Sequence, residues 1–208
     1  MKVLLVNGSP DREGCTYTAL SIVAEELEGA GIETQIFQLG TDPIEGCRDC
    51  RACFQTGDCV VKDGNVNEFV ALAKEADAFV FGSPVHFAAA GGKITSFLDR
   101  VFFSSRGKPF RLKPGAVVVS ARRAGTTAAL DQLSKYPAYA QMPLVTSCYW
   151  NMVHGTSPEE VRQDLEGVQT MQTLGKNMVW LLQSIEAGRA AGVEPPATER
   201  RIFTNFMR

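Results

Sequence analysis

The chain has 208 residues, of which 45% are hydrophobic and 21% are charged, and its formal net charge at neutral pH is −2. This length suffices for one domain with a full core, and the small net charge argues against general binding to nucleic acid or to anionic membranes. The apolar run in residues 1–6 is too short for a signal peptide, and no run approaches a membrane-spanning length. We therefore expect a cytoplasmic protein, in which six cysteines favour metal or redox chemistry over structural disulfides.

The first stretch of the chain predicts a strand, a polar loop and a helix. Residues 3–6 form an apolar run typical of a strand buried on both faces, and the turn residues Asn7 to Pro10 follow. Thr16 is the expected N-cap of the helix. Free N–H groups and the dipole at such a helix start favour a phosphate.

The loop sequence narrows the kind of phosphate ligand. It is neither GxGxxG nor a Walker A loop, and no acidic residue ends the second expected strand to bind an adenosine ribose. A terminal monophosphate, such as that of FMN, fits better than a dinucleotide. A generic turn of an α/β protein is the alternative.

Strands and helices are expected to alternate along the rest of the chain. Further strands are expected at 33–39, 77–82, 115–120 and 143–149, and helices at 65–76, 91–103, 126–133 and 158–187. This order predicts an α/β fold with a doubly wound, five-stranded parallel sheet and helices on both faces, whose ligands bind beyond the carboxyl ends of the strands. We expect one domain in residues 1–188 with a cysteine-rich insertion at 41–64, and an extended tail at 189–208.

The loop after the third expected strand suits a flat ring. Pro84 fixes the chain direction, small residues allow close approach of the backbone, and His86 and Phe87 supply aromatic surface. For His86, a surface histidine at a turn is the alternative.

These motifs together resemble the NADPH-dependent FMN reductase family over roughly residues 1–150. The residues that carry the resemblance are Gly8-Ser9-Pro10, Gly14-Cys15-Thr16, Ser83-Pro84-Val85-His86-Phe87 and the segment 93–100. The resemblance implies a flavodoxin-like fold and bound FMN. It assigns the phosphate to Ser9, Arg12, Cys15 and Thr16, and the ring to Pro84, Val85, His86 and Phe87.

Some positions depart from the family or carry a second interpretation. Relatives usually have asparagine where Cys15 stands, which leaves Cys15 its backbone N–H as the contact. In the loop after the fourth expected strand, Arg122 or Arg123 is suited to neutralise a reduced flavin or to attract the phosphate of a nicotinamide cofactor; a solvated pair is the alternative. Asp99 and Arg100 are expected to form a structural ion pair.

The most specific motif is C-x2-C-x2-C-x5-C, formed by Cys47, Cys50, Cys53 and Cys59. Compact triplets with a fourth cysteine are typical of [4Fe–4S] clusters, whereas structural zinc sites more often pair two CxxC motifs across a longer gap. Zinc and unliganded or redox-active thiols remain alternatives. The motif also resembles the iron–sulfur flavoproteins, a branch of the same family in which a cluster passes electrons to FMN. Cys148 is expected to be a buried residue of the fifth strand.

The favoured function is an FMN-dependent oxidoreductase that resembles NAD(P)H-dependent FMN or quinone reductases. Its partners would be NAD(P)H and a quinone or flavin, with no nucleic acid and no membrane. The flavin carries the chemistry, so no residue is assigned as catalytic. One alternative is an iron–sulfur flavoprotein fed by a ferredoxin-like donor, and another is a non-enzymatic redox sensor. The long last helix and the tail suggest a homodimer or homotetramer.

Overall fold

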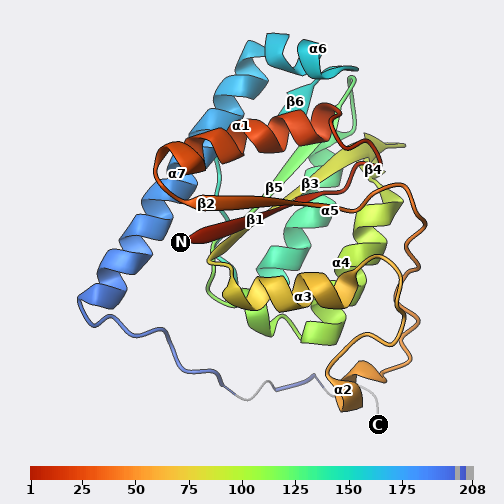
Figure 1. Ribbon diagram of the computed structural model, residues 1–208, viewed down its shortest axis with the longest axis vertical. Helices are drawn as coiled ribbons and strands as arrows, with labels where there is room; N and C mark the ends of the chain where they lie inside the picture. Colours follow the sequence, from red (N-terminus) through yellow and green to blue (C-terminus); the bar gives the residue numbers. More distant parts are fainter. Residues whose placement is uncertain (200–201, 205–208) are drawn as a thin grey trace.

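A parallel sheet lies at the centre of the computed structural model, which describes residues 1–199 and 202–204 (Figure 1). Its order is β2-β1-β3-β5-β6, and a short strand β4 pairs antiparallel with the end of β3. The strands are β1 (Lys2–Asn7), β2 (Glu33–Gln38), β3 (Ala78–His86), β4 (Ala89–Ala90), β5 (Gly115–Ala121) and β6 (Met152–His154). The predicted flavodoxin-like α/β fold is confirmed.

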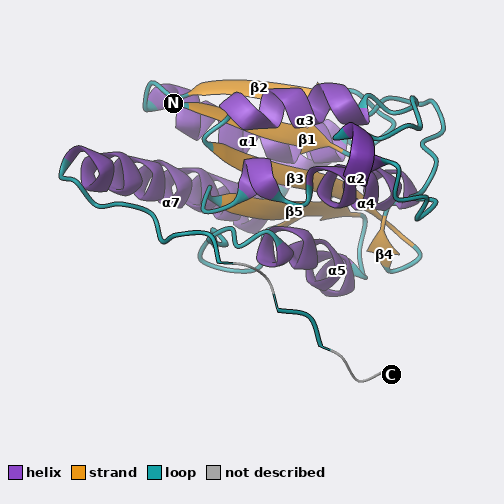
Figure 2. Ribbon diagram, turned by 90° about the horizontal axis from the view of Figure 1, so that it is seen from below, coloured by secondary structure: helices purple, strands orange, loops and turns teal. Residues whose placement is uncertain are grey.

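Helices cover both faces of this sheet (Figures 1 and 2). One face packs against α1 (Cys15–Gly29), α6 (Pro158–Gln163) and α7 (Leu165–Ala190), and the other against α3 (Val66–Glu75), α4 (Gly92–Ser105) and α5 (Thr126–Tyr139). The helix α2 (Cys53–Thr56) lies in the cysteine-rich insertion, and a 3-10 turn η1 (Lys108–Phe110) follows α4. The central strands are therefore apolar on both sides, as Leu4 and Leu5 show by packing into opposite cores.

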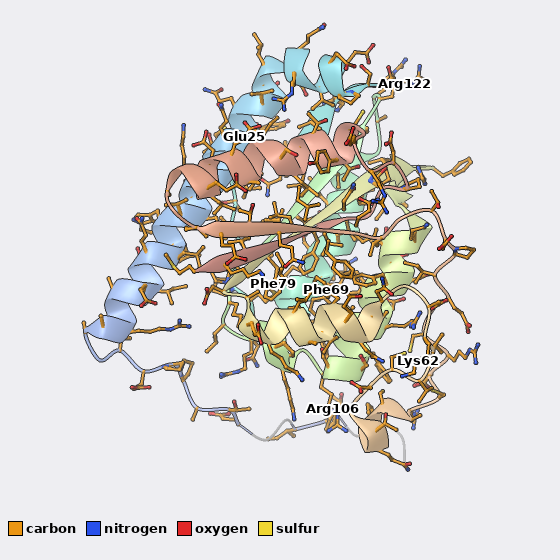
Figure 3. The ribbon with its side chains drawn as sticks, in the orientation of Figure 1. Glu25, Lys62, Phe69, Phe79, Arg106 and Arg122 are labelled. Atoms are coloured by element: carbon orange, nitrogen blue, oxygen red, sulfur yellow. The ribbon has the colours of Figure 1, made fainter. Side chains whose placement is uncertain are left out.

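The core between the sheet, α3 and α4 is rich in phenylalanine. Phe69 on α3 meets Phe79 on β3, and the centroids of their rings are 6.4 Å apart (Figure 3). Phe102 on α4 stacks on Phe110 with a centroid distance of 4.6 Å. This packing of buried rings anchors α4, which borders both candidate sites described below.

The prediction of a strand at residues 143–149 is wrong. Only Leu144 forms an isolated bridge, to Gly115, and the strand of this region is β6. Between them the chain turns outward, and the Ser147 hydroxyl bonds the Tyr149 carbonyl and Asn151 Oδ1, each at 2.7 Å. Local bonds of this kind compete with a sheet ladder. Cys148 lies in this turn and is exposed, so its expected burial in a strand is also wrong.

Three helix boundaries differ from expectation. The first helix begins at Cys15 with Gly14 at its N-cap, so Thr16 lies within the first turn. The helix after β5 continues to Tyr139 instead of ending at residue 133. The expected long helix at 158–187 is broken at Asp164, whose carboxylate caps α7 by accepting a hydrogen bond from the Gly167 amide at 3.0 Å.

The strand β3 also extends past its expected end at Gly82, as far as His86. At the carboxyl terminus, α7 continues to Ala190, and residues 193–199 and 202–204 are exposed and form no regular element. The remaining residues of the expected tail, 200–201 and 205–208, lie outside the described residues. Among those that are described, no helix has both the length and the apolar character needed to cross a bilayer.

Candidate functional site

The loop after β1 is held by side chains at the ends of two neighbouring strands. Asn7 ends β1, and its Nδ2 donates to Gln38 Oε1 at 2.5 Å and to the Asp11 carbonyl at 3.1 Å. Gln38 ends β2 and donates to the Ser9 carbonyl at 2.8 Å. Neither residue is among those predicted from the sequence, although polar side chains at adjacent carboxyl ends of a parallel sheet are a signal for a site.

Gly8 is required where this loop crosses β3. A Cβ at Gly8 would lie 2.7 Å from the Gly82 carbonyl oxygen and 2.8 Å from the Ile94 side chain. The Gly8 amide instead donates to that Gly82 carbonyl at 2.9 Å. The close approach fixes the loop between β3 and the first turn of α4.

The start of α1 is open to an anion. Within the described residues, no side chain caps this helix, so N–H groups of its first turn are left for a ligand. The hydroxyl-bearing residues Ser9 and Thr16 are buried beside the loop, whereas Arg12 is exposed. Thr16 Oγ1 lies 2.8 Å from Ser120 Oγ and so ties the helix start to the end of β5.

The Cys15 side chain contacts the loop after β6. Its Sγ donates to the Gly155 carbonyl at 3.5 Å, and burial raises the pKa of the thiol. Cys15 is therefore neutral at ordinary pH and offers its backbone N–H to a ligand. This contact also joins the start of α1 to the loop after β6.

The four residues expected to cradle a ring lie on one hairpin. Pro84 and Val85 are half-buried near the end of β3, and His86 and Phe87 are exposed at the tip. Phe87 and Ala88 take the left-handed conformation, with φ of +50° and +58°. Non-glycine residues at such angles are strained and are common in ligand-binding loops.

Two contacts hold this hairpin in place. The Ser83 hydroxyl accepts a hydrogen bond from the Gly91 amide at 3.0 Å, and the Ala90 amide donates to Gln132 Oε1 at 3.1 Å. Gly125, before α5, has φ of +92°, and a Cβ there would lie 2.5 Å from the Ala88 Cα. Arg122 and Arg123 are exposed in the same loop after β5, where Figure 3 labels Arg122.

These features fit FMN in their chemistry. The uncapped helix start, the Ser9 and Thr16 hydroxyls and the Arg12 charge suit a phosphate. The fixed hairpin, with its exposed aromatic tip, suits a planar ring. The loops after β1, β3 and β5 bring these parts to one edge of the sheet.

The four cysteines of the motif line a single cavity between the insertion and α4. Cys53 is buried, Cys59 is half-buried, and Cys47 and Cys50 are exposed. Burial raises the pKa of the Cys53 thiol, and repulsion from the three other thiols of the motif raises it further. The thiols are thus close enough to influence one another.

Arg100 lines this cavity, although no cavity role is predicted for it from the sequence. Its guanidinium, which is 1% exposed, donates Nε–H to Cys59 Sγ at 3.4 Å and forms an ion pair with Asp63. The expected ion pair with Asp99 is wrong, because Asp99 instead accepts from the Tyr136 hydroxyl at 2.6 Å. Arg48 and Arg51 also line the cavity, but they form surface ion pairs with Glu45 and Asp49.

The donor set of the cavity fits iron–sulfur chemistry, since its candidate ligands are all thiols. Across residues 1–199 and 202–204, no three of His, Cys, Asp and Glu are grouped closely enough to hold a metal ion.

A family model described as NADPH-dependent FMN reductase matches residues 1–157. The chain belongs to the NADPH-dependent FMN reductase family. An iron–sulfur flavoprotein of Methanocaldococcus jannaschii is 30% identical over 197 residues, covering 89% of this chain and all of the relative. One from Archaeoglobus fulgidus is 31% identical over 194 residues, covering 86% of this chain and 94% of the relative.

Among solved structures, RosB with a bound riboflavin phosphate intermediate has a TM-score of 0.71 at 14% identity, covering 99% of this chain and 92% of RosB. At that identity the likeness concerns the fold alone. The family membership makes this chain an FMN-dependent oxidoreductase.

Proposed function

We propose that this oxidoreductase binds FMN at the carboxyl edge of its sheet, within a domain formed by residues 1–188. The single observation that carries this assignment is the start of α1, which no described side chain caps. The residues proposed for the phosphate are Ser9, Arg12, Thr16 and the Cys15 amide, and those for the ring are Pro84, Val85, His86 and Phe87. Arg122 is proposed to offset the charge of the reduced ring.

Bound FMN supplies the hydride and electron chemistry of the reaction. The protein orients the ring between the hairpin and the loop after β5. Gln132 and Ser83 accept hydrogen bonds from the amides of Ala90 and Gly91, and so hold the chain where it returns from the hairpin tip. We propose NAD(P)H as the reductant and a quinone or a second flavin as the acceptor.

We further propose that Cys47, Cys50, Cys53 and Cys59 hold a [4Fe–4S] cluster that exchanges electrons with FMN. The shared cavity and the names of the two archaeal relatives support this proposal. The motif joins three closely spaced cysteines to a fourth, a spacing typical of such clusters.

A groove beside the cavity supports an acidic protein, such as a ferredoxin, as an alternative electron donor. Cys53 borders both the cavity and this groove, whose lining includes Lys74, Arg106 and Lys108. None of the three cations forms an ion pair with another described residue. Arg106 lies against the Phe54 ring of α2, 4.5 Å from its centroid, at the lower edge of the molecule in Figure 3. Unpaired cations near a redox site favour the encounter with an anionic partner.

Spectra and analysis of anaerobically purified protein test both cofactors. We expect flavin absorbance with a broad visible shoulder, together with bound iron and sulfide. Cys50→Ala should lose the iron and keep FMN, whereas Cys148→Ala, which removes an exposed cysteine outside the cavity, should keep both. Flavin bands without iron would refute the cluster, and failure to bind FMN would refute the flavin site. Bleaching of the flavin by NADPH but not by a reduced ferredoxin would support NAD(P)H as the donor, and the reverse result would support the ferredoxin.

We also propose a homodimer or homotetramer, whose contacts would include α7 and the part of the tail that the structure describes. Large apolar side chains on α7 support this, since Leu165 is 77% and Trp180 is 69% exposed. Sedimentation velocity would test it, and a monomer at micromolar concentration would refute it. A reducing compartment such as the cytoplasm is proposed because all six cysteines are free.

A further inference from the structure

One face of α4 forms a wall of the cysteine cavity. Arg100, Phe103 and Ser104 all line the cavity, and their spacing of three and four residues places them on the same side of the helix. Phe97 and Val101, which flank this side of the helix, are fully buried in the core. The helix is thus fixed by its apolar face and presents one buried cation to the insertion.

Arg100 donates five hydrogen bonds, all to residues of the insertion. Their acceptors lie near both ends of the insertion. The Nη groups donate to the Glu45 carbonyl at 3.2 Å, to the Val61 carbonyl at 2.6 Å, and to the carbonyl and carboxylate of Asp63. Glu45 precedes Cys47 by two residues, and Val61 follows Cys59 by two residues. The guanidinium therefore closes residues 45–63 into a loop.

Asp63 completes this closure. Its second carboxylate oxygen accepts a hydrogen bond from the Glu45 amide at 2.8 Å, so the two ends of the loop also bond each other. Within the loop the one helix is α2, which has four residues. Asp49 and Arg51 take left-handed angles, with φ of +48° and +57°. Such a segment has little intrinsic order, and the planar fork of Arg100 gives three of its carbonyls a hydrogen-bond donor.

We propose that Arg100 is the positioning residue of the cysteine loop, which is formed by residues 45–63. It holds the segment that carries the four thiols against α4 before any metal binds, and once a cluster is bound its Nε–H bond to Cys59 favours the reduced state. The second effect follows because a cationic donor beside a ligand sulfur stabilises added negative charge. The second effect rests on the proposed cluster, whereas the first concerns the chain alone.

The first test uses metal-free protein and measures alkylation of each cysteine by mass spectrometry. In Arg100→Gln we expect Cys53 and Cys59 to react at least tenfold faster than in the wild type, with the exposed Cys148 as the internal reference. Arg51→Gln is the matched control, because Arg51 is a cation that lines the same cavity. It pairs with Asp49, and among the described residues it bonds no sulfur. Arg100→Lys keeps the charge but not the fork, so its rates should be intermediate.

The second test measures the reduction potential of iron-loaded protein. Arg100→Gln should lower the potential by a tenfold change in the reduction equilibrium, which is about 59 mV for a one-electron couple. Arg51→Gln should shift it less. If Arg100→Gln does not fold, Arg100→Lys carries both measurements.

Wild-type rates and potential in the Arg100 variants would overturn the inference. A wild-type protein that takes up no iron would instead refute the proposed cluster, and the alkylation rates would still decide whether Arg100 closes the loop.

Discussion

Replacing Gly125 by alanine tests whether the β3–β4 hairpin positions the flavin. Gly125 precedes α5 with φ of +92°, and an added Cβ would lie 2.5 Å from the Ala88 Cα and 3.0 Å from Val85 Cγ1. Because the first of these is a backbone atom, the contact is relieved only by a shift of the backbone. We expect the exposed tip, with His86 and Phe87, to shift away from the ring.

The free energy of unfolding that Gly125→Ala is expected to lose has two parts. A left-handed angle costs an alanine about 1–2 kcal/mol, and overpacking costs about 1–3 kcal/mol more. Gly192→Ala isolates the first part, because Gly192 has φ of +84° and nothing within 4 Å of an added Cβ. The difference between the two variants, about 1–3 kcal/mol, is therefore the free energy of displacing the hairpin. If this free energy is lost from FMN binding, the affinity for FMN falls about fivefold to 150-fold.

The assay is titration of apoprotein with FMN, followed by quenching of flavin fluorescence, together with urea unfolding of both apoproteins. We expect Gly192→Ala to bind FMN as the wild type does. Its free energy of unfolding should fall only by the cost of the left-handed angle, about 1–2 kcal/mol. Gly125→Ala should lose affinity as well. Unchanged FMN affinity in Gly125→Ala, with its apoprotein destabilised, would refute the assignment of the ring to this hairpin.

Two further predictions concern the elements around the site. Thr16→Val removes the 2.8 Å bond to Ser120 Oγ and leaves that buried hydroxyl without its partner, so urea unfolding should show a loss of about 1–3 kcal/mol; a loss as large in Thr16→Ser, which keeps the hydroxyl, would contradict this reason. Hydrogen bonds from the Thr156 hydroxyl and amide lower the pKa of Glu160 below its usual 4.5. The ionised Glu160 side chain therefore stabilises the folded state above pH 4.5, and this stabilisation is lost as the pH falls through the lower pKa of the folded state. The melting temperature of Glu160→Gln should consequently fall less steeply in acid than that of the wild type.

The sequence allowed the sheet and its ligand edge to be predicted because their signals are local. Residues 3–6 and 115–120 are apolar on both faces, as strands under two layers of helix must be. The small and polar residues that follow the strands mark the loops where ligands bind. The prediction of FMN came from these loops together with the family resemblance.

The fifth strand could not be predicted because distant side chains decide its path. The apolar run at 143–149 has the composition of a strand, and its first residues do lie beside Gly115. The chain then leaves the sheet, where Asn177 of α7 donates to the Thr146 carbonyl at 2.7 Å. That bond joins residues 31 positions apart, and nothing in the run itself indicates it.

The role of Arg100 was missed for a geometric reason that the sequence did contain. Successive residues of a helix do not face each other, so Asp99 and Arg100 were poorly placed to pair. In the fold Asp99 turns to Tyr136 on α5, and Arg100 turns to the insertion. The partner of Arg100 could not have been named, because the insertion has no periodic pattern to show which residue would approach α4.

The helix α4 touches both candidate sites, and this arrangement lets them be separated by experiment. Its first turn contacts the loop after β1, where Ile94 leaves no room for a side chain on Gly8. Arg100 follows six residues later, about 9 Å along the axis, and meets the cysteine loop. Phe97, Leu98 and Val101 hold the helix between these points and are fully buried, so they should keep it in place when Arg100 is replaced. We therefore expect Arg100→Gln to free the cysteine loop while FMN affinity stays at the wild-type value. A matching loss of FMN affinity would mean that Arg100 fixes α4 itself, and that the two sites respond to the helix as one unit.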